Sequence, residues 1–161
     1  MTNQFATRVA LGLAATVMVI SGGCMRSQKT TVPLVESVRG YADGLRWRNH
    51  PAAATYIPSR ERADFLEHWE QLEDEFLVTD YQLARVKPHG DKRATVRVKY
   101  TWHFDARGVV NSTMVVQKWE RRGKRWFLVE ERRLRGEPMP GVAEPDPVKE
   151  PDLVKEPVSA N

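Results

Sequence analysis

The stretch Ala-Thr-Val-Arg-Val-Lys-Tyr-Thr-Trp-His-Phe-Asp, residues 94–105, decides the fold class of this chain. Small or apolar side chains alternate with polar ones along its whole length. Because successive side chains of a β-strand point to opposite faces of the sheet, this period of two is typical of a half-buried strand. We therefore expect every second residue from Ala94 to Phe104 to point into a core. The alternate residues, from Thr95 to Asp105, should face solvent.

The neighbouring stretches repeat this period. Residues 78–87, 109–120 and 126–134 are expected to be strands, and turn-forming residues lie in each gap, at 87–91, 105–108 and 122–124. Sequential strands joined by short turns pair in antiparallel fashion. The sequence thus predicts a four-stranded antiparallel meander.

A helical period comes before the meander. Pro33 suits the first turn of a helix, and the apolar residues after it recur at helical spacing: Leu34, Val38, Tyr41, Ala42 and Leu45. We expect a short helical turn at 52–57 and a second helix after Ser59, whose apolar face would contain Ala63, Leu66, Trp69, Leu72 and Phe76. Helices followed by a meander predict an α+β domain over residues 32–136, with the helices on one face of the sheet.

The charge of the chain is unevenly distributed. Residues 137–161 are rich in proline and carry a net −4, which predicts an extended, solvated tail. This tail is either a spacer or a linear motif for an envelope partner. Since the whole chain has a net +4 and Arg8 is the one charge in residues 1–24, residues 25–136 carry +7. A basic domain favours anionic partners.

The N-terminus has the residue pattern expected of an export signal. Arg8 precedes the largely apolar run 9–20, and the small residues 21–23 lead directly to Cys24, the single cysteine of the chain. This arrangement resembles the lipobox of bacterial lipoproteins, although Ser21 stands where a branched aliphatic residue is usual. The alternatives are a secretory signal cut elsewhere and an uncleaved anchor.

The lipoprotein resemblance implies a signal peptide at 1–23, lipidation of Cys24 and a lipid-anchored tether at 24–31. In that family a diacylglycerol is attached to the cysteine sulfur and an acyl chain such as palmitate to its amine. Met25, rather than aspartate, follows the cysteine, which by the same analogy implies sorting to the outer membrane, facing the periplasm.

The order of the expected elements resembles the cone-shaped nuclear-transport-factor-2-like (SnoaL-like, cystatin-like) superfamily. The similarity covers residues 32–135 and is clearest at 116–128, where Trp119 and Trp126 flank a tight turn. Enzymatic members hold an acid or base residue in the mouth of the cone. Asp80, Tyr81 and Tyr100 are candidates for that position, but none has an evident partner, so no catalytic residue and no cofactor is assigned.

Two sets of candidate binding residues follow from the strand pattern. Aromatic side chains could line a pocket in the cone, or simply fill its core: Tyr81, Tyr100, Trp102, Trp119 and Trp126. Basic side chains could contact anionic lipid or acidic glycan, or protect strand edges from aggregation: Arg97, Lys99, His103, Arg121, Arg122, Lys124 and Arg125. The four histidines lie on different expected elements, so no metal site is expected, and nucleic acid is not an expected partner of an exported lipoprotein.

These expectations favour a membrane-anchored, non-enzymatic envelope module that binds a small apolar ligand or a protein partner. One alternative is a SnoaL-like or ketosteroid-isomerase-like enzyme. It would need a partly buried Asp, His or Tyr at the pocket floor with a second polar group in hydrogen-bond reach, and aromatic side chains filling the cone would argue against it. Another alternative is an assembly lipoprotein that acts through its proline-rich tail.

Overall fold

The computed structural model describes residues 25–72, 75–105 and 108–145. Helical elements come first and are followed by four strands: α1 (Met25–Arg46), α2 (His50–Ala54), the 3-10 helix η1 (Ser59–Glu61), α3 (Arg62–Gln71), β1 (Phe76–His89), β2 (Arg93–Phe104), β3 (Val110–Arg122) and β4 (Arg125–Gly136). The expected signal peptide and Cys24 lie outside the described residues. Within those residues, no helix is both long and apolar enough to span a bilayer.

The strands form one antiparallel sheet in the order β1-β2-β3-β4, so the predicted meander is confirmed. Tight turns join β1 to β2 and β3 to β4. Gly90 and Gly123 occupy them with φ angles of +70° and +63°, in the left-handed region that glycine enters without steric cost.

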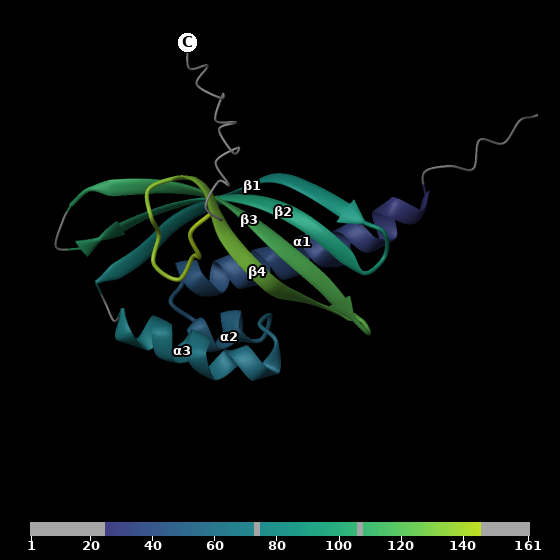
Figure 1. Cartoon of the computed structure of the whole chain (residues 1–161), viewed down its shortest axis with the longest axis horizontal. Helices are drawn as coiled ribbons and strands as arrows, with labels where there is room; N and C mark the ends of the chain where they lie inside the picture. Colours follow the sequence, from purple (N-terminus) through teal and green to yellow (C-terminus); the bar gives the residue numbers. More distant parts are fainter. Residues whose placement is uncertain (1–24, 73–74, 106–107, 146–161) are drawn as a thin grey trace, which may run out of the picture.

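The helices lie on one face of this curved sheet (Figure 1). The inward residues of β2 from Ala94 to Trp102 are buried, as the alternation in the sequence predicts. The expected face of α1 packs against them, and all five of its apolar residues are buried: Leu34, Val38, Tyr41, Ala42 and Leu45. The core therefore lies between α1 and the concave side of the sheet.

Two helix expectations need correction. First, α1 begins at Met25, so the helix includes residues 25–31, ahead of the start expected near Pro33. Pro33 lacks an N–H and removes one backbone hydrogen bond, but it does not prevent the residues before it from adopting helical angles. Second, the packed face of α3 contains Phe65 and Trp69, with Leu72 packing just after the helix, whereas Ala63 is exposed and Phe76 belongs to β1.

The first part of the expected tail also packs on the domain. Residues 137–145 turn back beside β4, where the Ala143 carbonyl accepts from the Arg133 amide at 2.7 Å. The Arg133 guanidinium bonds the Glu144 carboxylate, and Met139 is only 4% exposed. A buried methionine and backbone pairing outweigh the extended preference of the prolines over this segment. The remainder of the expected tail, residues 146–161, lies outside the described residues.

Candidate functional site

A buried polar network crosses the core at Gln117 of β3, a residue with 0% exposure. Its amide nitrogen donates to the Glu131 carboxylate at 2.7 Å and to the Tyr100 hydroxyl at 3.2 Å. Its amide oxygen accepts from the Trp119 indole N–H at 2.9 Å. Gln117 therefore links β2, β3 and β4 inside an otherwise apolar core.

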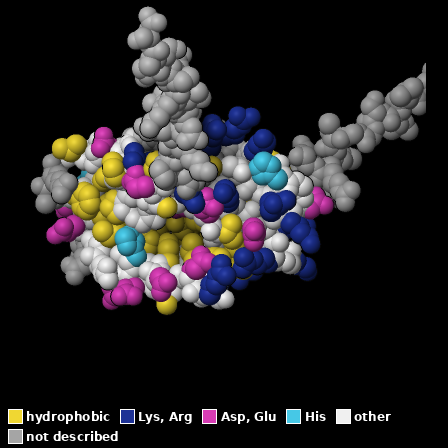
Figure 2. All heavy atoms as spheres, in the orientation of Figure 1, with side chains coloured by type: hydrophobic (Ala, Val, Ile, Leu, Met, Phe, Trp, Pro, Cys, Tyr) yellow, Lys and Arg dark blue, Asp and Glu magenta, His cyan; other side chains and the backbone are white. Residues whose placement is uncertain are grey.

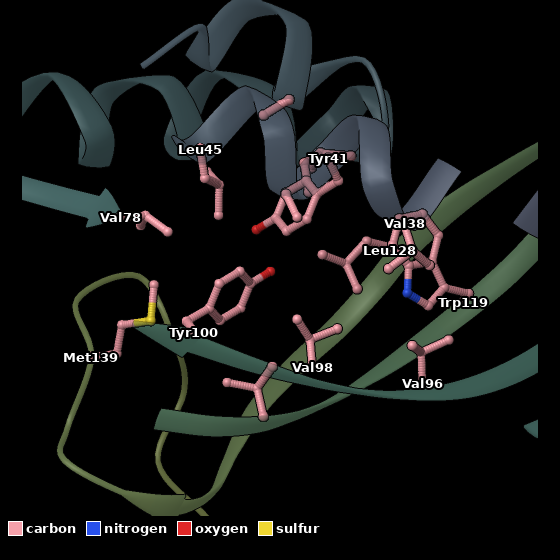
Figure 3. Close-up of a cluster of buried hydrophobic side chains, with 14 of the residues drawn as sticks. Val38, Tyr41, Leu45, Val78, Val96, Val98, Tyr100, Trp119, Leu128 and Met139 are labelled. Carbon is pink, nitrogen blue, oxygen red and sulfur yellow. The ribbon is translucent and has the colours of Figure 1, made fainter. Parts of the chain in front are cut away.

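Helix α1 completes the network through Tyr41. The Tyr41 hydroxyl donates to the second carboxylate oxygen of Glu131 at 3.0 Å. Figure 3 shows the hydroxyl ends of Tyr41 and Tyr100 pointing toward one another from the helix and from the sheet. Both carboxylate oxygens of Glu131 are thus hydrogen-bonded within the protein.

Irregularities in β4 place Glu131 on the inner face. Lys118 pairs with Glu130, but the next residue of β3, Trp119, pairs with Leu128, so that Val129 is an additional residue in β4. Such a bulge reverses which residues of a strand face inward. Leu128 points into the core on one side of the bulge, and Glu131 does so on the other.

Burial and hydrogen bonding act in opposite directions on the Glu131 carboxyl group. Removal from water raises its pKa, and the hydrogen bonds from Gln117, Tyr41 and Tyr100 offset part of this increase. Burial, together with the nearby Glu131 carboxylate, raises the pKa of Tyr41 and of Tyr100 well above the usual phenol value. The network therefore favours neutral phenols and a carboxyl group that is protonated more readily than one in water.

A surface hollow of about 250 Å³ opens above this network, and Tyr41 and Glu131 contribute to its lining. Its apolar wall includes Ile57, Phe65 and Leu128, while Gly141 and Ala143 of the 137–145 segment form its far side. We call this space the Glu131 hollow. Its size suits a small ligand with an apolar body.

Two further carboxylates line the Glu131 hollow, and both are neutralised by partners. Glu61 pairs with Arg60 at 2.9 Å. Glu130 pairs with Lys118 at 2.8 Å and with Arg132 at 2.9 Å. The Glu131 carboxylate, by contrast, accepts its hydrogen bonds from neutral groups, the Gln117 amide and the Tyr41 hydroxyl.

The five candidate pocket residues differ in burial: four lie in the core, and Tyr81 lies at its edge. Tyr100, Trp102, Trp119 and Trp126 are core residues with 3% exposure or less. Tyr81 is half-buried, and its hydroxyl donates to Asp43 of α1 at 2.9 Å, an arrangement that raises the pKa of Tyr81 to about 12 through burial and the Asp43 carboxylate. Asp80 lies beside Arg46, with 4.0 Å between their charged atoms.

The seven candidate basic residues fall into two groups. Arg97, Lys99 and His103 lie along the outer face of β2, where His103 is 3.7 Å from Asp105. The other four surround the β3–β4 turn: Arg121, Arg122, Lys124 and Arg125. Figure 2 shows lysines and arginines concentrated over the end of the molecule that holds the β1–β2 and β3–β4 turns.

A second hollow, of about 400 Å³, lies at this basic end and is lined in part by His89, Arg93, Lys118 and Trp119. An adjoining hollow of about 230 Å³ shares His89 with it and adds Arg85, Lys87 and Arg97. Histidine, cysteine and carboxylate side chains do not gather into a metal-binding group anywhere in the described ranges.

No protein-family model and no curated protein matches the chain, but several solved structures resemble it. One is a ketosteroid isomerase-like protein from Erwinia carotovora atroseptica SCRI1043, with a TM-score of 0.55, 14% identity, and coverage of 67% of this chain and 98% of that one. Another is an NTF-2 like protein of unknown function from Shewanella oneidensis MR-1, with a TM-score of 0.52, 11% identity, and coverage of 64% and 97%. The chain has a nuclear-transport-factor-2-like fold.

A SEC-C motif containing protein from Rhodopseudomonas palustris is also similar, with a TM-score of 0.51, 14% identity, and coverage of 71% of this chain and 96% of that one. At these identities the likeness concerns the fold. The activity has to be argued from the residues of this chain, because one fold serves many chemistries.

Sequence reasoning missed the central members of the site, Tyr41, Gln117 and Glu131. Gln117 could have been noticed in the sequence, because this polar residue interrupts the apolar period of β3 between Val115 and Trp119. Glu131 was not, because its inward orientation depends on the bulge at Val129.

Proposed function

We propose that this chain is a membrane-anchored envelope lipoprotein whose cone domain is a non-catalytic module that binds a small apolar ligand. The anchor rests on the lipobox-like residues 21–24. The observation that carries the binding role is that the Glu131 hollow lies above a polar network whose hydrogen bonds are already made within the protein.

Closure of this network disfavours catalysis. A general base needs a carboxylate oxygen that can reach the proton of a substrate. Both oxygens of Glu131 accept internal hydrogen bonds, from Gln117 and Tyr41, and aromatic side chains fill the deeper part of the cone. What remains for a ligand is the apolar wall formed by Ile57, Phe65 and Leu128.

Binding can be tested with N-phenyl-1-naphthylamine, a neutral apolar probe whose fluorescence rises on leaving water. We expect Ala143→Trp, which fills the Glu131 hollow, to weaken binding at least ~10-fold, because the probe loses its apolar contacts. Ser112→Trp, on the separate hollow beside Lys99, is the control. Equal binding by both variants would refute the hollow as the ligand site.

The anchor has its own test. Cys24→Ser should release the protein into the soluble fraction of lysed cells, because the residue that carries the lipid is absent. Retention of the variant in the membrane fraction would argue against lipidation.

A SnoaL-like or ketosteroid-isomerase-like enzyme is the second candidate, favoured by the raised pKa of Glu131 and the phenol of Tyr41 beside it. Such an enzyme would move a proton from the α-carbon of a β,γ-unsaturated ketone to its γ-carbon, through Glu131. Conversion to the conjugated ketone is followed by ultraviolet absorbance. If the wild type and Glu130→Gln convert the ketone but Glu131→Gln does not, the domain is an enzyme and the proposed non-catalytic role is refuted.

The third candidate, assembly through the proline-rich tail, is tested by crosslinking the native lipoprotein in membranes. An unchanged set of crosslinked partners after deletion of residues 137–161 would refute it.

A further inference from the structure

The two hairpin turns at the basic end of the domain form one continuous surface. The Arg121 amide, next to the β3–β4 turn, donates to the Lys92 carbonyl in the β1–β2 turn at 2.7 Å. We define the basic end as residues 87–93 and 121–125. Its cations greatly outnumber its single acid, Asp91: Lys87, Lys92, Arg93, Arg121, Arg122, Lys124 and Arg125.

Most of these cations are not used in the internal ion pairs of the domain. Lys87, Lys92, Arg93 and Lys124 are exposed and form no ion pair with any residue in the described ranges. Arg122 pairs with Glu120, and the guanidinium groups of Arg122 and Arg125 lie over the Phe127 ring at 5.8 and 5.3 Å. Unpaired cations held on a rigid hairpin are available to an external anion.

The N-terminus of α1 lies at the same end of the molecule. Figure 1 shows α1 beginning at the end where the β1–β2 and β3–β4 turns lie and running beneath the sheet toward the opposite end. The helix begins at Met25, the residue after Cys24. A lipid on Cys24 would therefore be joined to the basic end by helix rather than by a long flexible linker.

We propose that the basic end is a docking surface for anionic phospholipid headgroups and holds the domain in a fixed orientation on its membrane. This inference rests on the proposed anchor at Cys24. Attachment at this end turns the basic residues toward the headgroups, where each lysine or arginine near the surface contributes about a fivefold gain in association. The cation-lined hollows beside His89 offer space for the phosphate oxygens.

The test uses the mature lipoprotein purified from membranes and reconstituted into vesicles of phosphatidylcholine, with or without phosphatidylglycerol. Hydrogen exchange is followed at the turn amides of residues 90–92 and 122–124. We expect exchange at both turns to be at least ~5-fold slower with phosphatidylglycerol, and the difference to disappear at about 1 M salt, where the Debye length is ~3 Å. Residues 108–110, in the turn at the other end of β3, should exchange equally in both lipids.

Matched variants assign the effect to the basic end. Lys92→Gln with Lys124→Gln removes one exposed cation from each turn, which should weaken association about 25-fold and so reduce the difference between the lipids. Arg39→Gln with Arg135→Gln removes two exposed cations from α1 and from the far part of β4, and should preserve it.

Equal exchange in both lipids would overturn the docking surface. So would protection by dextran sulfate, an acidic polysaccharide, without protection by phosphatidylglycerol. The mass of the N-terminal peptide separates this inference from the proposed anchor. An unacylated Cys24 would refute the anchor. In that case the protein can be added to preformed vesicles, and the same exchange comparison would still show whether the basic end docks on anionic lipid.

Discussion

The Tyr41 hydroxyl, on the first helix, donates to the Glu131 carboxylate, on the last strand, across 3.0 Å and 90 residues of sequence. This hydrogen bond is the polar link between the helical layer and the sheet at the centre of the core. An enclosed carboxylate that loses a donor keeps its desolvation cost without compensation.

Replacement of Tyr41 should therefore measure the strength of this link. We expect Tyr41→Phe to lower the free energy of unfolding by ~1–2 kcal/mol, because it leaves one Glu131 oxygen with a donor fewer. Urea denaturation followed by tryptophan fluorescence provides the measurement. Tyr81→Phe is the matched control, since it removes a hydroxyl bonded to Asp43 at the half-buried edge, and it should cost less.

The raised pKa of Glu131 makes stability depend on pH. The carboxyl group binds its proton more tightly in the folded than in the unfolded state, so its stabilising contribution is complete below its ordinary value of 4.5 and declines as pH rises through the folded pKa. Glu131→Gln cannot titrate and should show a flatter dependence of unfolding free energy on pH above 4.5. A parallel dependence in the wild type and the variant would show that the carboxyl group does not titrate abnormally.

How far the sequence predicts this molecule depends on the length over which a pattern is uninterrupted. The alternation at 94–105 and the spacing from Leu34 to Leu45 correctly predicted a strand, a helix and their buried faces. Each rests on a regular period without bulges. The fold class followed from these elements and from the short turns between the strands.

The site could not be predicted in the same way. Glu131 and Arg133 lie beyond the bulge at Val129. The alternation before the bulge, if continued, would place both residues on the outer face of the sheet, whereas the bulge turns them inward. Proline content likewise predicted a tail from residue 137, whereas the packing of 137–145 depends on contacts with Ser112 and Thr113 of β3 and with Arg133 of β4. Both features arise from tertiary pairing, which a local period does not contain.

The two tryptophans that flank the β3–β4 turn should respond differently to substitution. The Trp119 N–H donates to Gln117, whereas the Trp126 N–H is buried without a hydrogen-bond partner in the described part of the chain. Both substitutions to Phe lose a similar volume, but Trp119→Phe also leaves the Gln117 amide oxygen unpaired. We expect Trp119→Phe to be the more destabilising by at least ~1 kcal/mol in urea unfolding. Equal losses would mean that the Gln117 bond contributes nothing to stability.

Gly44 of α1 is expected to be required for close packing against α2. A Cβ at this position would lie 2.8 Å from both the Cβ and the backbone nitrogen of Ala53. Alanine improves helix propensity by ~1 kcal/mol, but a clash with backbone cannot be relieved by rotating a side chain. We predict that Gly44→Ala lowers the free energy of unfolding by ~1–3 kcal/mol. Gly40→Ala, which meets the end of the Tyr56 ring, should cost less because that ring can move.

The segment after β4 should contribute to the stability of the domain. Met139 is buried against the core, the Ala143 carbonyl accepts from the Arg133 amide, and Glu144 bonds the Arg133 side chain. A chain ending at Gly136 exposes the surface that Met139 covers and leaves the inward Arg133 without its carboxylate. Compared with a chain ending at Pro145, we expect a loss of ~2–3 kcal/mol in thermal or urea unfolding, mostly from the apolar surface. Because the Glu144 side chain is mostly exposed to solvent, Glu144→Gln alone should reproduce only a small part of this loss. If the two truncated chains unfold alike, residues 137–145 do not stabilise the domain, and the far side of the Glu131 hollow is not held by them.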